Sequence, residues 1–505
     1  MSNTIRGEPD YADVQGVVRF GYKKLTDATY LLLRIKDAAA ARAWLRSAPV
    51  ANAVSVSPAP STALQIAFTA PGLRALGVPE ATLAQFSSEF LGGMTAEARA
   101  RRLGDVGPNA PSEWEWGGAS TGSGAVPHVV VMLFADPSAG GVEPFERLVT
   151  GSSWSAAFDV MRRLHTGDLK GREPFGFADG ISQPDVDWQQ HRDPPKAQVD
   201  YGNVAALGEF LLGYRNEYRK YTDRPLLDAG ASTADLLPAE EAPDKRDLGK
   251  NGTYLVMRQL QQDVRGFWQF IAKYSGPNVE DASRFAAAFV GRTTDGSPLV
   301  PVQERAIPGV GRAADDARLN QFTFDDDPGG ARCPIGAHIR RANPRNADFP
   351  GHPTGLAQLI ATLGITRRGY ADDLTSSVRF HRILRRGREY GPGLSPAEAL
   401  ALAPTNDPER GLHFVCLNAN ITRQFEFLQN SWVMGTKFAG LSGESDPLLG
   451  NRLPLPGCPV TSNFTRPGDG SMRHRVEGLP RFVTVRGGAY FFLPSLRALR
   501  YFAAG

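Results

Sequence analysis

Apolar positions recur along the chain in short blocks of two kinds. Runs typical of β-strands lie at residues 63–70, 128–135, 412–419 and 483–493. Blocks with the spacing of amphipathic helices lie at residues 80–90, 142–151, 279–291 and 422–432. The strand runs alternate as half-buried antiparallel strands do. The pattern predicts an α+β fold in which helices pack on antiparallel sheets.

One strand–helix block occurs twice. The segment ATYLLLRIKDAAAARAWL from Ala28 matches GTYLVMRQLQQDVRGFWQF from Gly252 at five identical positions. All five have the same offset, as Trp44 and Trp268 show (268 − 44 = 224). Each copy is typical of a strand followed by a helix with a tryptophan on its apolar face. The constant offset favours an internal duplication over a chance likeness between apolar strands.

The repeat predicts two halves with a polar connection between them. The chain has 505 residues, which is long for one ordinary core. The stretch between the copies is rich in proline, alanine, glycine and charge, as loops are. We expect an N-terminal domain at residues 1–190, a loop-rich connection at 191–250 and a C-terminal domain at 251–505.

The composition excludes several classes of protein. The net charge of +3 is small and spread along the chain, which argues against nucleic acid as a partner. No apolar run reaches the roughly 18 residues of a membrane span, and no hydrophobic signal segment is found. The three cysteines form no CxxC pair, so neither a zinc site nor a disulfide framework is indicated. We expect a cytoplasmic protein without a membrane partner, with a secreted or encapsulated form left open.

One of the eight histidines lies in a distinctive context. His338 stands in RCPIGAHIRRANPR, with Arg341 and Arg345 three and seven residues further on. On a helix these spacings return to one face. The arrangement suits an axial ligand for a macrocycle that carries carboxylates. It suits a phosphate-binding or surface patch equally well.

Two other segments contain candidate catalytic groups. PFGFADGISQP, residues 174–184, holds Asp179 between small residues and aromatics, either as a turn former or as a carboxylate held for chemistry. RFHRILRRGREYG, residues 379–391, is rich in arginine, and one arginine of such a run can point inward while the others stay solvated. No dinucleotide-binding, Walker A, HExxH, GxSxG or kinase motif competes with them.

Taken in order, four segments resemble the dye-decolorising peroxidase family of haem enzymes. They are GFADG at 176–180, CPIGAHIRRANPR at 333–345, RILRRGREYG at 382–391 and GLHFVCLNANITRQFEFLQNSW at 411–432. The resemblance covers most of the chain, from about Asp13 to Tyr501. It implies two ferredoxin-like halves of the duplicated dimeric α+β barrel type, with one haem b per chain in the C-terminal half. It also implies a peroxidase that reduces hydrogen peroxide and oxidises dyes, phenolics or other bulky organic reductants.

The resemblance also implies roles for individual residues. His338 matches the axial ligand of the haem iron, Asp179 the distal carboxylate and Arg385 the distal arginine. The other positions matched to the haem surroundings are Asn343, Arg345, His381, Leu412 and Phe414. The first three match positions near the propionates, and the two apolar residues match the lining of the distal pocket.

The chemistry of a peroxidase suggests further candidates. An axial imidazole gains basicity from a carboxylate on its other nitrogen, for which we expect Asp446, although an Asp-Pro turn is the simpler explanation. A nearby arginine would keep Asp179 ionised, and Arg385 would offset charge on the leaving oxygen. For reductants too large to enter, Tyr390 and Trp432 are candidate electron relays, with ordinary packing as the alternative.

Two other functions are compatible with a haem site. One is a haem-iron or porphyrin-processing enzyme, and the other is a non-catalytic haem-binding protein. A carrier needs His338 but not an acid–arginine pair, so Asp179 and Arg385 separate these hypotheses. The sequence makes no prediction of oligomeric state.

Overall fold

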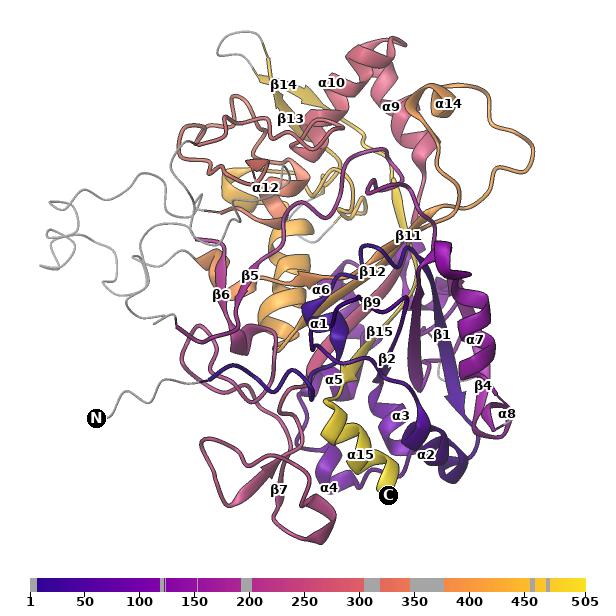
Figure 1. Ribbon diagram of the computed structural model, residues 1–505. Coiled ribbons are helices and arrows are strands. Elements are labelled where there is room, and N and C mark those ends of the chain that lie inside the picture. Colours follow the sequence, from indigo (N-terminus) through magenta and orange to yellow (C-terminus); the bar gives the residue numbers. More distant parts are fainter. Residues whose placement is uncertain are drawn as a thin grey trace, which may run out of the picture.

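The computed structural model describes residues 7–118, 122, 124–151, 153–191, 202–303, 318–345, 377–454, 459–468 and 473–505. Within these ranges the chain forms one nine-stranded sheet and three two-stranded sheets, with helices packed around the large sheet (Figure 1). No helix in this part of the chain is long and apolar enough to cross a membrane.

The N-terminal half contributes four strands to the large sheet. Its main elements are β1 (Asp27–Ile35), α2 (Ala38–Ser47), β2 (Thr62–Phe68), β3 (Val129–Ala135), α7 (Val142–Val149) and β4 (Phe158–His165). The strands pair antiparallel in the order β4-β1-β3-β2. This is the β-α-β-β-α-β arrangement of a ferredoxin-like unit, in which the first strand lies between the third and the fourth.

The C-terminal half repeats this order. Its main elements are β9 (Thr253–Gln262), α9 (Val264–Ser275), α10 (Val279–Val290), β10 (Leu384–Arg385), β11 (Arg388–Tyr390), β12 (Gly411–Asn418), η8 (Thr422–Glu426), η9 (Leu428–Val433) and β15 (Val483–Leu493). The strands follow the order β15-β9-β12-β10, and β11 also pairs with β12. The strands β1 and β9, which carry the repeated sequence, therefore hold the same place in the two halves. The predicted α+β class with two ferredoxin-like halves is confirmed.

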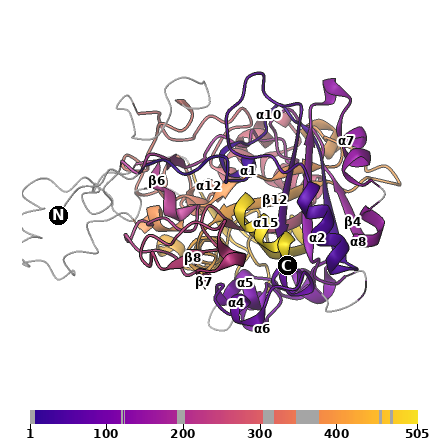
Figure 2. The ribbon, with the colours of Figure 1, turned by 60° about the horizontal axis from the view of Figure 1, so that its bottom comes forward.

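The two halves form one continuous sheet. Strand β15 pairs with β2 through Phe492 and Phe68. The other two edges also approach each other, because the Gly167 amide, just after β4, donates to the Glu389 carbonyl on β11 over 2.7 Å. The C-terminal helix α15 (Leu496–Ala504) returns to the N-terminal half and lies beside α2 (Figure 2).

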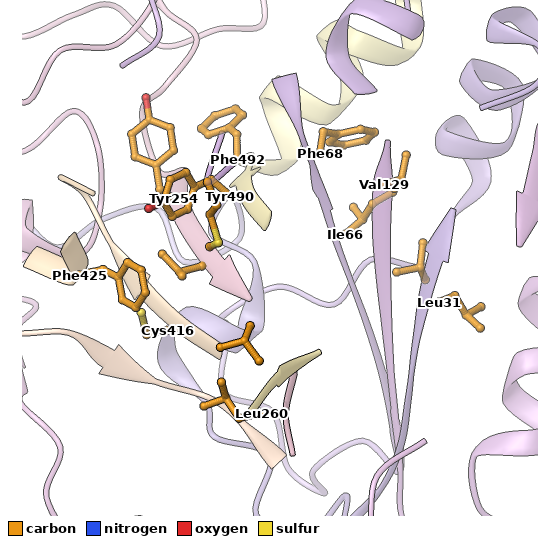
Figure 3. Close-up of a cluster of buried hydrophobic side chains, with 14 of the residues drawn as sticks. Leu31, Ile66, Phe68, Val129, Tyr254, Leu260, Cys416, Phe425, Tyr490 and Phe492 are labelled. Carbon is orange, nitrogen blue, oxygen red and sulfur yellow. The ribbon is translucent and has the colours of Figure 1, made fainter. Parts of the chain in front are cut away.

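Both faces of the large sheet are buried. On one face, side chains such as Leu31, Ile66, Tyr254 and Phe492 pack in a continuous apolar layer that spans the two halves (Figure 3). On the other face a second cluster includes alternate residues of the same strands, such as Leu32. This explains why β1 and β3 are buried at nearly every position instead of alternating as a half-buried strand would.

Shorter elements surround the sheet. The α-helices are α1 (Gly16–Arg19), α3 (Ala70–Ala75), α4 (Glu80–Leu83), α5 (Ser88–Gly92), α6 (Glu97–Leu103), α8 (Trp154–Ala157), α12 (His338–Ala342) and α14 (Pro396–Leu400). The short 3-10 turns are η1 (Gly107–Asn109), η2 (Pro111–Glu113), η3 (Pro137–Ala139), η5 (Leu207–Glu209), η6 (Ala231–Thr233), η7 (Ser377–His381) and η10 (Phe438–Gly440). The short strands are β5 (Asp185–Asp187), β6 (Val204–Ala206), β7 (Leu226–Asp228), β8 (Lys245–Asp247), β13 (Phe464–Pro467) and β14 (Arg473–Val476). They lie mainly in the connections, where they pair two by two.

The predicted elements are largely present, with two differences. The helix predicted over 80–90 is divided into α4 and α5, because the Ser87 side chain accepts from the Phe90 amide and starts a new helix there. The helix predicted over 422–432 is wound more widely than an α-helix, as the bond from the Glu426 amide to the Ile421 carbonyl shows. Such wide turns are frequent at functional sites.

The predicted connection is more ordered than a loop where it is described. Phe210 and Leu211 are fully buried in the second apolar cluster. Cys333 and Cys416 are buried with free thiols, and Cys458 lies outside the described residues. The domain boundaries at residues 190 and 250 stay a prediction.

Candidate active site

A large cavity lies against the strands of the C-terminal half, and residues that precede these strands, such as Asp105 and Asp179, also line it. Strand residues that line it come from β9, β10, β12 and β15, and the other lining residues come mainly from α12, η9 and the hairpin before β5. Most of the lining is apolar, including Phe177, Leu260, Ile339 and Leu448. A mainly apolar cavity into which polar and charged groups also project is typical of a cofactor site.

His338 begins α12 and lines the cavity. Its Nδ1 lies 2.9 Å from Oδ2 of Asp446, whose side chain is fully buried. Burial alone would lower the pKa of His338, but the Asp446 carboxylate raises the pKa above its ordinary value. With Nδ1 engaged in this contact, Nε2 is the ring nitrogen left for a ligand.

The Asp446 carboxylate is itself held in place. Its Oδ1 accepts hydrogen bonds from the amides of Leu448 and Leu449, both at 2.9 Å. Asp446 therefore has both functions considered from the sequence: it accepts hydrogen bonds within an Asp-Pro turn and it contacts His338. Burial would raise the pKa of Asp446, but His338 and the Leu449 amide hold the pKa below its ordinary value. The acid is thus fixed as a charged acceptor for the imidazole.

Asp179 and Arg385 form an ion pair that also lines the cavity. The Nη1 atom of Arg385 donates to Oδ1 of Asp179 over 3.0 Å. About 43% of the Asp179 side chain is accessible, and the residue lines the cavity. Enclosure in the protein would raise the pKa of Asp179, but the Arg385 guanidinium and the Gly180 amide hold the pKa below its ordinary value. The carboxylate is therefore ionised under acidic conditions and can accept a proton.

The local backbone places these two residues. Gly180 has a φ of +77°, which a residue with a side chain adopts only with strain. A Cβ at Gly387 would lie 2.7 Å from the His413 carbonyl, so the glycine allows the segment after β10 to pass close to β12. The amide of Arg385 also donates to the side chain of Gln183 over 3.0 Å, which joins β10 to the Asp179 segment.

Arg386 and Arg388 of the same run point elsewhere. Arg386 donates to the carbonyls of Val17 and Val18, at 2.7 and 2.9 Å, and Arg388 donates to the N-terminal segment as well. Neither lines the cavity. Within the run, Arg382 and Arg385 line the cavity, whereas Arg386 and Arg388 bind backbone carbonyls.

The arginines after His338 do not share a helical face. Helix α12 ends at Ala342, and Arg345 has a φ of +57° beyond it. Arg345 lines the cavity, and its guanidinium lies 3.7 Å from the centre of the Phe322 ring. Arg341 is fully buried and donates to backbone carbonyls, including that of Trp432. The idea of one basic helical face is wrong, because the helix is too short.

Asn343 and His381, which the resemblance matches to the haem surroundings, also line the cavity. His381 is stacked on Phe427 with ring centroids 3.6 Å apart, and its Nδ1 contacts the Arg423 carbonyl. Trp432 packs edge-on against the His381 ring at 5.3 Å.

Leu412 and Phe414 project from β12 into the cavity, on the same side of the strand. Tyr390 does not line it. Tyr390 is stacked on His413 with ring centroids 4.5 Å apart, and its hydroxyl donates to Glu409. Of the two candidate relays, Trp432 is therefore the one in contact with a residue of the cavity wall.

Sequence reasoning missed several polar residues of the cavity. Among them are Glu173, Arg258 and Arg292. Burial raises the pKa of Glu173 to about 7 and lowers the pKa of Arg292 to about 9. Glu173 directly precedes the PFGFADG segment, and an acid next to such a turn is a signal that could have been noted. The two arginines lie in otherwise ordinary strand and loop patterns and gave no such signal.

The residues present fit a haem group. The apolar walls suit a flat macrocycle, and Nε2 of His338 suits its iron. Arg292 and Arg345 are both nearly fully buried and face the same ring of Phe322, a concentration of positive charge that suits carboxylate groups. Fold and cavity together are those of a haem peroxidase.

Comparisons with known proteins identify the family of haem peroxidases. The chain is 30% identical over 513 residues to the dye-decolorizing peroxidase msp1 of Mycetinis scorodonius, covering 97% of this chain and 86% of the relative. Its structure is similar to that of a decolorizing peroxidase from Auricularia auricula-judae, with a TM-score of 0.71, 25% identity and coverage of 98% and 100%. It is also similar to a dye-decolorizing peroxidase in complex with 2,6-dimethoxyphenol, with a TM-score of 0.69, 25% identity and the same coverage. No protein-family model matches. The chain belongs to the dye-decolorising peroxidase family, whose members are haem enzymes that use hydrogen peroxide to oxidise dyes and phenolics.

Proposed function

We propose that this peroxidase binds one haem b per chain in the cavity of the C-terminal half, with Nε2 of His338 as the axial ligand. The observation that carries the proposal is the 2.9 Å contact between His338 Nδ1 and Asp446 Oδ2. It orients the ring and makes the imidazole a stronger donor to a metal. When bound, the haem supplies the iron at which peroxide is reduced.

Asp179 is proposed as the base of the reaction. Its carboxylate takes a proton from one oxygen of hydrogen peroxide and delivers it to the other oxygen, which leaves as water. Arg385, 3.0 Å from Asp179, keeps the base ionised and offsets negative charge on the leaving oxygen. Over a full cycle one hydrogen peroxide and two molecules of a one-electron reductant, AH, give two waters and two radicals.

Arg345, Asn343 and His381 are proposed to hold the haem carboxylates. All three line the cavity, and Arg345 is 2% exposed. Arg292 adds a second buried cation near the Phe322 ring. Salt bridges with propionates would neutralise this charge and fix the orientation of the macrocycle.

Leu412 and Phe414 are proposed to narrow the space above the haem, so that peroxide enters and large reductants do not. Methoxyphenols are proposed as one class of reductant, which the relative solved with 2,6-dimethoxyphenol supports. Bulky reductants would then deliver electrons through Trp432, which packs against His381. Tyr390 stays a second, less direct candidate.

Haem loading and a peroxide assay test the proposal together. The purified protein reconstituted with haem is expected to show a Soret band and to oxidise 2,6-dimethoxyphenol only when peroxide is added. Asp179 and Arg385 separate this function from haem storage, because a carrier needs no acid–arginine pair. A Soret band without peroxide-driven oxidation would contradict the proposal and favour a haem-binding or porphyrin-processing protein.

A further inference from the structure

The hairpin that carries Asp179 is closed by its own backbone. The Asp179 amide donates to the Gly171 carbonyl over 2.9 Å, and the Glu173 amide donates to the Phe177 carbonyl over 2.9 Å. The turn between them is closed by the Gly176 amide, which donates to the Glu173 carbonyl over 2.8 Å. Asp179 therefore stands at the base of a short hairpin, and Glu173 stands at its turn.

The Glu173 carboxylate occupies the inside of this turn. Its Oε2 accepts from the Phe175 amide over 2.9 Å, and its Oε1 accepts from the Phe177 amide over 3.0 Å. Both oxygens of one side chain thus bind donors of the turn, whose shape then depends on the carboxylate. The two aromatic residues also pack on α9, with the rings of Phe175 and Phe267 4.6 Å apart.

The same carboxylate joins the hairpin to the large sheet. Gln262, the last residue of β9, donates from Nε2 to Oε2 of Glu173 over 2.8 Å. Strand β9 pairs with β12, and β12 pairs with β10, which ends at Arg385. Glu173 therefore connects the hairpin that carries Asp179 to the same sheet that carries Arg385.

A carboxylate at this place is electrostatically unfavourable. Glu173 lines the cavity, and among the described residues no ion pair involves it. Burial and the nearby charge of Asp179 raise its pKa to about 7, despite the three donors that stabilise the ionised form. Three hydrogen bonds, from the Phe175 and Phe177 amides and from the Gln262 side chain, therefore hold this carboxylate in place.

We infer that Glu173 is a positioning residue for the reaction with peroxide: its carboxylate fixes the Asp179 hairpin on β9, so that Asp179 meets both Arg385 and the bound peroxide. The inference rests on the proposed role of Asp179 as the base. Glu173 itself transfers no proton in this scheme. Because a misplacement of about 1 Å at a reacting group can cost about a hundredfold in rate, the hairpin anchor should be visible in kinetics.

A double-mutant cycle on the haem-loaded enzyme tests the inference. Glu173→Gln leaves one acceptor oxygen for two turn amides, so we expect a normal Soret band but a rate constant with peroxide at least tenfold lower. The KM for the reductant should not change. Asp179→Asn should be slower still, and the double variant should be no slower than Asp179→Asn alone, because Glu173 acts through Asp179. Glu389→Gln, which loses a carboxylate that accepts from the Leu169 amide outside the cavity, should keep the normal rate.

The outcomes are distinguishable. A normal rate for Asp179→Asn would overturn the proposed function. Two other results would overturn only the inference about Glu173. One is a normal rate constant with peroxide for Glu173→Gln. The other is a slow Asp179→Asn variant whose rate constant falls further when Glu173→Gln is added. If Glu173→Gln does not fold, Gln262→Met removes only the bond to β9 and should give a smaller loss in the same direction, again absent from the Asp179→Asn background. A Gln262→Met enzyme with normal kinetics would then contradict the inference.

Discussion

Nδ1 of His338 and Oδ2 of Asp446 lie 2.9 Å apart, although 108 residues separate them in the sequence. The imidazole comes from the start of α12, and the acid comes from the loop after η10 (Phe438–Gly440). Two backbone amides hold the other oxygen of Asp446, so the carboxylate presents Oδ2 to the ring. The contact fixes which nitrogen of His338 faces the cavity, and the following predictions start from it.

Asp446→Asn should weaken haem binding. The amide keeps the shape of the side chain but removes the charge that makes the imidazole a strong donor, so we expect an affinity about 10–100-fold lower. Titration of the apoprotein with haem, followed at the Soret band, measures the change. Glu444→Gln is the matched control, because this nearby buried acid bonds to Thr465 and not to His338. Equal affinities for Asp446→Asn and the unmodified protein would show that the contact has no role in haem binding.

Arg385→Leu and Arg386→Leu should differ sharply. Arg385 contacts Asp179 in the cavity, whereas Arg386 donates to the carbonyls of Val17 and Val18. We expect the first variant to keep haem and to lose about 10²–10³-fold in its rate with peroxide, the size of effect seen when a donor to developing charge is removed. The second should keep the rate and lose thermal stability. Stopped-flow mixing with peroxide measures the rates, and the reverse order would show that the assignment is wrong.

The acid limit of the reaction should follow the pKa of Asp179. Arg385 holds this pKa below its ordinary value, so the base is ionised in acid and activity falls only when the pH approaches the lowered pKa. Removal of the positive charge in Arg385→Leu raises the pKa of Asp179. The acid limb of the rate–pH profile should therefore move to higher pH in the residual activity of the variant. A limb that stays in place would mean that another group sets the acid limit.

His413 should make the fold sensitive to acid independently of the active site. Burial lowers its pKa to about 4, and its ring is stacked on Tyr390. Between the ordinary pKa near 6.5 and pH 4, the unfolded chain binds a proton that the folded chain does not, so stability falls as the pH falls. The loss can reach about 3 kcal/mol, at about 1.4 kcal/mol per unit of pKa difference. Melting temperatures at pH 7 and pH 4.5 should converge in His413→Phe, and an unchanged difference between them would exclude this residue as the cause.

The fold was predictable from the sequence where periodicity is strong. The offset between Trp44 and Trp268 identified the duplication, because both tryptophans are buried at the same place of the repeated unit. The prediction of a single helix over 80–90 was wrong, because the Ser87 side chain caps a new helix there despite the helical spacing of the apolar residues. The basic helical face failed because α12 has only five residues, a property that the sequence pattern of RCPIGAHIRRANPR does not show.

The site residues could be predicted where a distinctive sequence motif contains them. Residues that reach the cavity only because of the fold could not be predicted. His338, Asp179 and Arg385 stand in distinctive segments, and the structure brings all three to one cavity. Arg258 reaches the cavity because alternate residues of β9 face it, which requires knowledge of the sheet. Glu173 is held by hydrogen bonds within a turn, and its place directly before PFGFADG is its one signal in the sequence.

The most direct test of the central claim is the absorption spectrum of haem-loaded His338→Ala, recorded with and without added imidazole. If His338 provides the axial ligand, the variant should lack the Soret band of the unmodified protein, and imidazole that enters the space left by the side chain should restore it. A Soret band that is unchanged in His338→Ala and indifferent to imidazole would show that the ligand lies elsewhere, and would contradict the proposed site.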